Sequence, residues 1–241
     1  MILSRLKKSF LPVTFIFVAN FTFAQSNYFK YSYGFGGGIN KSYTDVYEGS
    51  IGYTTYGVFE YNLTPYVTLG LDGQYGMVQG GDIHTDPYNR QFITKYTSVT
   101  FNAKVMMGEY VYYDKSEFLY NLRGLYFGLG VGFINNKVTD VVRQRPSFSN
   151  DPGYTFPGKD KSVNLHVPIN VGFNYFITDG YGYQRYIINI NAQANYTFGE
   201  GLDGYDDPSN KFKNYSPDIF NAYTIGFRYM FGTIKAYRKT L

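Results

Sequence analysis

An alternation of period two that recurs along most of this chain restricts its fold more than any other feature. In 125–133, "LYFGLGVGF", large apolar residues fill every second position, and glycine fills three of the four positions between them. Such a pattern places successive side chains on opposite faces of a β-strand. Eight segments show it and are predicted to be strands: 31–40, 51–63, 66–78, 99–107, 125–133, 165–175, 188–198 and 223–231.

Two architectures fit eight alternating strands, a soluble sandwich and a membrane barrel. The predicted strands match the roughly 9–11 residues of a tilted membrane-crossing strand better than the roughly 5–6 of a soluble one. The connections also alternate: 63–66 and 178–182 are short, whereas the segments on the other side are longer and polar. These longer segments are 41–50, 80–91, 139–164 and 200–219. Short inner turns and long outer loops are typical of outer-membrane barrels.

Aromatic residues gather near the strand ends, and the chain contains 28 Tyr and 22 Phe. One predicted girdle holds Tyr31, Tyr61, Tyr66, Tyr175, Tyr229 and Phe231, and the other holds Tyr53, Tyr75, Tyr96, Phe133, Tyr196 and Phe198. Aromatic girdles mark the two interfaces of a membrane barrel. The sequence therefore predicts an all-β protein, an eight-stranded antiparallel up-and-down transmembrane β-barrel.

Residues 1–24 have the pattern of a secretory signal peptide. Arg5, Lys7 and Lys8 precede an apolar run over 10–23, and the run ends at Ala24. We expect the barrel to occupy 25–231 and a basic tail, 232–241, to lie in the periplasm.

Without the three basic residues of the leader the chain is nearly neutral, which gives no support for nucleic-acid binding. No cysteine is present to form a disulfide or a thiolate metal site.

The alternating glycines are expected to face the barrel interior. Gly34, Gly36 and Gly38 lie on the first strand and Gly128, Gly130 and Gly132 on the fifth, opposite it in a ring of eight. An eight-stranded barrel has room only for its own side chains. We expect the space left by these glycines to be filled by larger polar residues of strands three and seven: Asp72, Gln74, Asn189, Asn191 and Gln193.

Four charged residues are predicted to point inward and sum to zero: Glu60, Asp72, Lys104 and Arg228. Three of them, Glu60, Lys104 and Arg228, lie at similar distances from the inner ends of their strands and are expected to share a layer. Charges in a lumen of low dielectric constant must pair. An ion-paired plug is the structural interpretation, and a gate or polar path is the functional alternative.

With these features the chain resembles the small eight-stranded outer-membrane β-barrel family of Gram-negative bacteria, over nearly all of 28–231. The most specific element is the last strand, where Thr224, Gly226, Tyr229 and Phe231 have the spacing of the family's assembly signal. The resemblance implies recognition of this strand by the barrel-assembly machinery and a location in the cell outer membrane. Family members commonly end at the final aromatic residue, whereas this chain continues.

Two histidines offer the only candidates for catalysis, His84 in the second outer loop and His166 near the outer end of strand six. Some small barrels are lipid-modifying enzymes that use His with Ser, but neither histidine has a serine two residues on. The serines before His166 are Ser147, Ser149 and Ser162. We expect no enzymatic activity and no cofactor, with lipid modification as the minor alternative.

The outer loops hold two further groups of charged residues. Asp203, Asp206 and Asp207 lack the spacing of a calcium loop and are expected to be solvated. Arg143 and Arg145 offer contacts to lipopolysaccharide phosphates or to a protein partner.

The expected function is structural or interactive, with outer-membrane lipid and lipopolysaccharide as surroundings. A narrow pore or a small-ligand carrier through the glycine-lined lumen is the alternative.

The inner connection 108–124 is longer than the other inner turns. It contains "DKSE", in which Asp114 is followed three residues later by Glu117. That spacing predicts one turn of helix with a capping box. An extended hairpin of strands four and five is the alternative.

Overall fold

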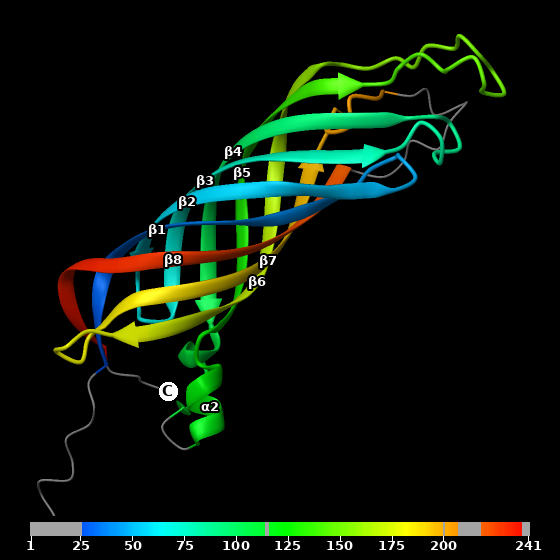
Figure 1. The fold of residues 1–241 in the computed structure, drawn as a ribbon. Coiled ribbons are helices and arrows are strands. Elements are labelled where there is room, and N and C mark those ends of the chain that lie inside the picture. The colour runs from blue at the N-terminus through cyan, green and yellow to red at the C-terminus, as the bar shows by residue number, and fades with distance from the viewer. Residues whose placement is uncertain (1–25, 114–115, 200, 207–217, 238–241) are drawn as a thin grey trace, which may run out of the picture.

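The computed structural model describes residues 26–113, 116–199, 201–206 and 218–237, and over these ranges the chain is a closed antiparallel barrel of eight strands. Each strand pairs with the next in sequence, and β8 pairs with β1 to close the ring (Figure 1). The strands are β1 (Ser26–Tyr43), β2 (Gly49–Asn62), β3 (Val67–Gly81), β4 (Gln91–Met106), β5 (Leu125–Val141), β6 (Lys161–Thr178), β7 (Gln184–Phe198) and β8 (Asp218–Tyr237). The predicted fold is confirmed. The signal peptide, 1–24, lies outside the described residues.

The strands are longer than the apolar alternation indicated. β4 begins eight residues before the predicted start at residue 99, and β5 continues eight residues past residue 133. In these extensions the outward positions are polar except Ile93, so the apolar alternation stops while the backbone pairing continues. The boundary placed at residue 231 is also too early, because 232–237 continue β8, where Tyr237 pairs with Ser26. Residues 238–241 lie outside the described part of the chain.

The two ends of the barrel differ in their connections. At one end, here called the turn end, the tight turns after β2 and β6 lie together with the connection between β4 and β5, which contains the short helices η2 (Met107–Glu109) and α2 (Glu117–Leu122) (Figure 1). The helix prediction for 108–124 is thus correct, but the residue before α2 is Ser116 and its side chain makes no capping bond. Asp114 lies outside the described residues. The opposite end, which carries the longer loops, is called the loop end.

None of the helices that the structure describes is long and apolar enough to cross a membrane.

Every strand exposes large apolar side chains on the outer surface of the barrel. One such residue from each strand, in order, is Phe35, Phe59, Leu71, Phe101, Leu129, Val171, Ile190 and Ile225. Two members of the predicted girdles, Tyr66 and Tyr96, are instead buried inside, each with 1% of its surface exposed. Tyr96 alternates with the outward Lys95 and Thr97, so its position in the strand directs it inward. Tyr66 stands in a turn, where the alternation no longer fixes its direction.

Interior glycines lie directly against large interior side chains. A Cβ built on Gly36 would stand 2.6 Å from the ring of Tyr56, and one on Gly76 would stand 2.8 Å from the ring of Tyr96. A Cβ on Gly128 would stand 2.9 Å from the stem of Lys104. Larger side chains therefore do fill the space that the glycines leave, but the predicted source of these side chains is wrong. At the glycines of β1 and β5 the nearest side chains are Arg228, Tyr56, Lys104, Asn170, Asn102, Pro168 and Thr100, and none is one of the predicted residues of β3 and β7.

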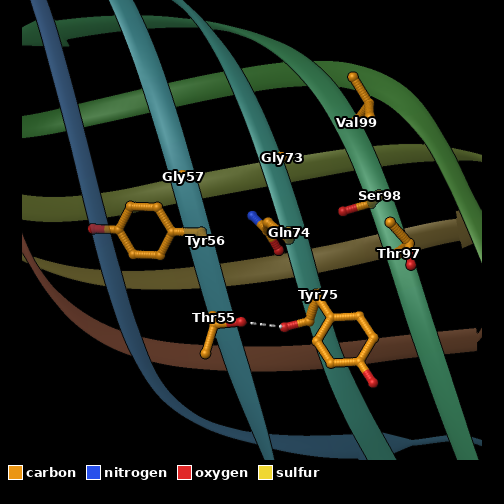
Figure 2. Close-up of a pocket in the computed structure, with 9 residues that line it drawn as sticks. All are labelled: Thr55, Tyr56, Gly57, Gly73, Gln74, Tyr75, Thr97, Ser98 and Val99. Atoms are coloured by element: carbon orange, nitrogen blue, oxygen red, sulfur yellow. Dashed lines mark hydrogen bonds between the residues drawn. The ribbon is translucent and has the colours of Figure 1, made fainter.

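Two other glycines, Gly57 and Gly73, face outward and pair with each other across β2 and β3. They line an open depression of about 300 Å³ in the barrel wall, together with other residues of β2, β3 and β4. Figure 2 shows the lining residues and the hydrogen bond that Thr55 donates to the carbonyl oxygen of Tyr75. A Cβ on Gly73 would have no atom within 4 Å. Glycine at this position is not required by packing.

The two kinds of glycine give a matched test of the interior. Gly36→Val is expected to destabilise the barrel by about 1–3 kcal/mol, because the added methyl groups overlap the Tyr56 ring and the adjacent backbone. Gly73→Val, the same change on the opposite face, is expected to be neutral or stabilising. Urea unfolding of the protein in lipid vesicles measures both. Equal losses for the two variants would contradict the assignment of faces.

Candidate functional site

A polar network inside the lumen, nearer the turn end, is organised around the carboxylate of Glu60, which is 1% exposed. Lys104 of β4 donates to Oε1 at 2.9 Å, and Arg228 of β8 donates to Oε2 at 2.6 Å. Ser32 of β1 donates to the same Oε2 at 3.1 Å. Three of the four predicted interior charges therefore meet in one layer, and one carboxylate joins strands on different sides of the barrel.

The charged cluster continues into a network of amides. The second guanidinium nitrogen of Arg228 donates to Oδ1 of Asn174 at 3.0 Å, and Asn189 donates to that same oxygen at 2.8 Å. Asp72 lies apart from this cluster: it accepts from Asn102 at 2.9 Å and forms no ion pair with the described residues. Asp72 therefore takes no part in the ion pairs that join the other three charges.

Side chains from opposite walls of the barrel meet across the lumen. Gln74 of β3 donates to Gln193 of β7 at 3.0 Å, as the positions of these residues predicted. The Tyr126 hydroxyl of β5 donates to Asn191 at 2.9 Å. Tyr56 of β2 donates to Asn189 at 3.3 Å. The two tyrosines were not predicted as parts of the interior, although both have the inward parity of their strands.

The loop end is closed by a cluster of apolar side chains. Val78, Phe92, Tyr96, Ile134 and Phe220 come from strands, and Val46, Phe156, Leu202 and Tyr205 come from loops that fold over them. The backbone N–H of Gln91 donates to the Tyr205 hydroxyl at 3.1 Å, and this hydroxyl lies 3.0 Å from the Gln91 carbonyl oxygen. Burial raises the pKa of the Tyr205 phenol well above its ordinary value, so the group stays neutral and able to donate.

The turn end is closed in a similar way. Tyr66, Met106 and Tyr126 form a buried cluster against which Tyr113, Phe176 and Tyr237 pack. Tyr237 donates to Glu109 of η2 at 3.0 Å. Burial, together with the adjacent Glu109 carboxylate, raises the pKa of Tyr237 to about 12. The extension of β8 is thereby fastened to the connection between β4 and β5.

The structure places the two histidines in different surroundings. His166 is fully buried: its Nε2 lies 2.8 Å from Oδ1 of Asn195, and its ring stacks on Phe220. Of the candidate serines, Ser162 bonds to Asn136, Asn164 and the Gly201 carbonyl instead. His84 is exposed and stacks on Phe148 of the third loop, with ring centroids 5.4 Å apart. Within the described residues, neither imidazole contacts a serine hydroxyl.

Three of the remaining charged candidates, Asp203, Asp206 and Arg143, have structural partners, whereas no side-chain partner of Arg145 is found among the described residues. Asp203 accepts from the Tyr205 backbone, and Asp206 lies 4.0 Å from Lys159, while Asp207 is outside the described residues. Arg143 pairs with Asp160 at 2.7 Å and donates to the Gly204 carbonyl, so its guanidinium holds the third and fourth loops together. The part of the chain that the structure describes contains no group of three acidic, His or Cys side chains arranged to hold a metal ion.

The predicted assembly-signal residues follow the alternation of β8. Thr224 is buried on the inward side, and a Cβ on Gly226 would stand 3.0 Å from the ring of Tyr56. Tyr229 and Phe231 face outward and stack on each other with centroids 6.5 Å apart. Each of the four therefore has a packing role, and their recognition by assembly machinery stays a prediction.

Comparisons with known proteins give structural similarities only. No family model matches the chain, and no curated protein sequence matches it. Among solved structures, Neisserial surface protein A matches at 11% identity and a TM-score of 0.48, covering 84% of this chain and 97% of its own. OprG from Pseudomonas aeruginosa matches at 12% identity and a TM-score of 0.41, covering 86% and 98%. Ail of Yersinia pestis matches at 13% identity and a TM-score of 0.41, covering 86% and 99%.

The chain resembles these small outer-membrane barrels in its fold. Its assignment as an eight-stranded up-and-down barrel stands on its own strand pairing, in which every strand has two neighbours and the last pairs with the first.

Proposed function

We propose that the protein is an integral outer-membrane barrel without enzymatic activity, which presents its loop end outside the cell. The observation that carries this proposal is the outer surface, where all eight strands expose large apolar side chains. Soluble monomers rarely expose contiguous apolar patches larger than a few hundred Å². A closed barrel also leaves no strand edge unpaired, which is what a span through lipid requires.

The interior supports a closed barrel rather than a pore or a carrier. The ion pairs of Glu60, the amide bridge of Gln74 and Gln193, and the apolar clusters at the two ends place interacting side chains at several levels of the lumen. Removing this packing would expose buried charges and amides without partners, which is costly. The function is therefore assigned to the loops and the outer wall, as a structural or interaction role.

Planar-bilayer recording tests the closed barrel. The purified, folded protein is expected to give rare small openings or none, because side chains fill an eight-stranded lumen. Insertion is verified on the same samples by protection of the barrel from protease in vesicles. A steady, large conductance from inserted monomer would contradict the proposal and favour the narrow-pore alternative.

A further inference from the structure

Three lysines stand side by side on the outer wall near the loop end. Lys95 of β4 is the direct cross-strand partner of Lys137 of β5, and Lys137 is in turn the direct partner of Lys161 of β6. All three side chains are exposed. Directly opposed residues have Cβ atoms about 4.5–5.5 Å apart, and like charges in such pairs are destabilising. We refer to these residues as the lysine row.

Within the part of the chain that the structure describes, no acidic side chain forms an ion pair with the lysine row. None of the three ammonium groups has a side-chain hydrogen bond with the described residues either. Two acidic residues lie beside the row: Asp160 is held by Arg143 at 2.7 Å, and Asp140, the cross-strand partner of Ile93, is exposed and forms no ion pair with the described residues. Three unpaired cations in one register therefore form a surface whose charge is complementary to an anion from outside.

The position of the row indicates which anion it meets. On each of the three strands the lysine lies four residues beyond an apolar outward residue, namely Val99, Phe133 and Leu165, which are themselves cross-strand partners. Thr97, Asn135 and Val163 stand between the two rows, and Ile93 is the outward residue beyond Lys95 on β4. Four residues of a tilted strand rise roughly 10 Å. The row thus lies just above the apolar band, at the depth of the headgroups of the outer leaflet. The exposed lysine at the loop end of β1, Lys41, is opposed by Ile51 and Asn221 rather than by lysine.

We propose that Lys95, Lys137 and Lys161 form a binding site for the phosphate groups of an outer-leaflet glycolipid, the lipid A part of lipopolysaccharide. This inference rests on the proposed insertion in the outer membrane. Adjacent strands are about 4.8 Å apart, so the three ammonium groups extend over roughly 10 Å, enough to contact a headgroup with more than one phosphate. Bound phosphate removes the repulsion between the opposed lysines.

The test uses the full mature chain in phosphatidylcholine vesicles, in vesicles that also contain lipid A, and in vesicles that contain dephosphorylated lipid A. The variant K95Q/K137Q/K161Q is compared with K30Q/K41Q/K235Q, which removes the same charge from lysines that are not opposed to one another. Retained lipid A is counted by native mass spectrometry after detergent extraction. The first variant is expected to bind about a hundredfold more weakly than the unaltered protein, because each lysine near anionic lipid contributes roughly fivefold. The control variant is expected to bind as the unaltered protein does.

Stability toward urea supplies a second readout, because the row variant is expected to change it in opposite directions in vesicles without and with lipid A. In pure phosphatidylcholine the row variant is expected to unfold at the same or a higher urea concentration than the unaltered protein, because repulsion has been removed. With lipid A present the row variant is expected to unfold at a lower urea concentration than the unaltered protein.

If all proteins insert but lipid A and dephosphorylated lipid A are retained equally, or the row variant retains as much lipid A as the control variant, the lysine site is wrong while the proposed function stands. If no protein inserts in any vesicle, the proposed function fails and the site fails with it.

Discussion

Glu60→Gln is expected to lower the free energy of unfolding by about 3–5 kcal/mol, since it leaves two buried cations without their carboxylate. The Lys104 and Arg228 side chains are almost completely buried, and Glu60 is the ion-pair partner that the structure gives to both. The glutamine oxygen preserves one hydrogen bond but neutralises neither cation. Urea unfolding of the protein in vesicles, followed by tyrosine fluorescence and by heat-dependent electrophoretic mobility, measures the loss.

Asp72→Asn is the matched control, because it also removes one interior carboxylate charge. Asp72 has no ion pair in the described residues, and its contact with Asn102 can be kept by the asparagine oxygen. Asp72→Asn is expected to lower the free energy of unfolding by clearly less than Glu60→Gln does. If the two variants lose equal stability, the network does not depend on Glu60 as its centre.

Leu129→Arg is expected to destabilise the inserted barrel by about 2–4 kcal/mol, the cost of a cation on the lipid face near the middle of the bilayer. Leu129 is outward, 51% exposed, and lies at the centre of the alternating stretch of β5. The measurement is urea unfolding in vesicles that contain only uncharged lipid, so that the added charge gains nothing from the surface.

Asn135→Arg is the depth control on the same face of the same strand. Asn135 lies beyond Phe133, past the apolar band, so the expected cost falls to about 0–1 kcal/mol. If Leu129→Arg costs no more than Asn135→Arg, the outer wall does not face lipid, and the soluble sandwich packing of that face would have to be reconsidered.

The strands were predictable because in each of the eight the residues on the outer wall must be apolar. A position such as Leu129 must be apolar whatever its neighbours are, so the alternation is visible in a single segment. The ends of the strands were not predictable in the same way. Beyond Phe133 the outward positions become Asn135 and Lys137, which an alternation of apolar residues cannot detect although the pairing continues.

The interior was predictable only in part. The shared layer of Glu60, Lys104 and Arg228 followed from their equal distance to the turn end, because neighbouring strands keep register. The contact between Arg228 and Asn174 could not be found in this way, since it joins strands that do not pair and depends on how the barrel is sheared. The same holds for Phe156 and Tyr205, which close the loop end from segments that have no periodicity.

The seam between β1 and β8 has a consequence for the kinetics of folding. It pairs Ser26 with Tyr237 and continues to Tyr43 and Ile219, so the last residues of the barrel must find the first. Contacts this distant in sequence slow folding, because the entropy of closing the loop is lost before any pairing compensates for it. A chain halted before β8 leaves both β1 and β7 with open edges, which are prone to aggregate. Synthesis of this barrel and its closure are therefore separate events in time, and the chain needs protection from aggregation in the interval between them.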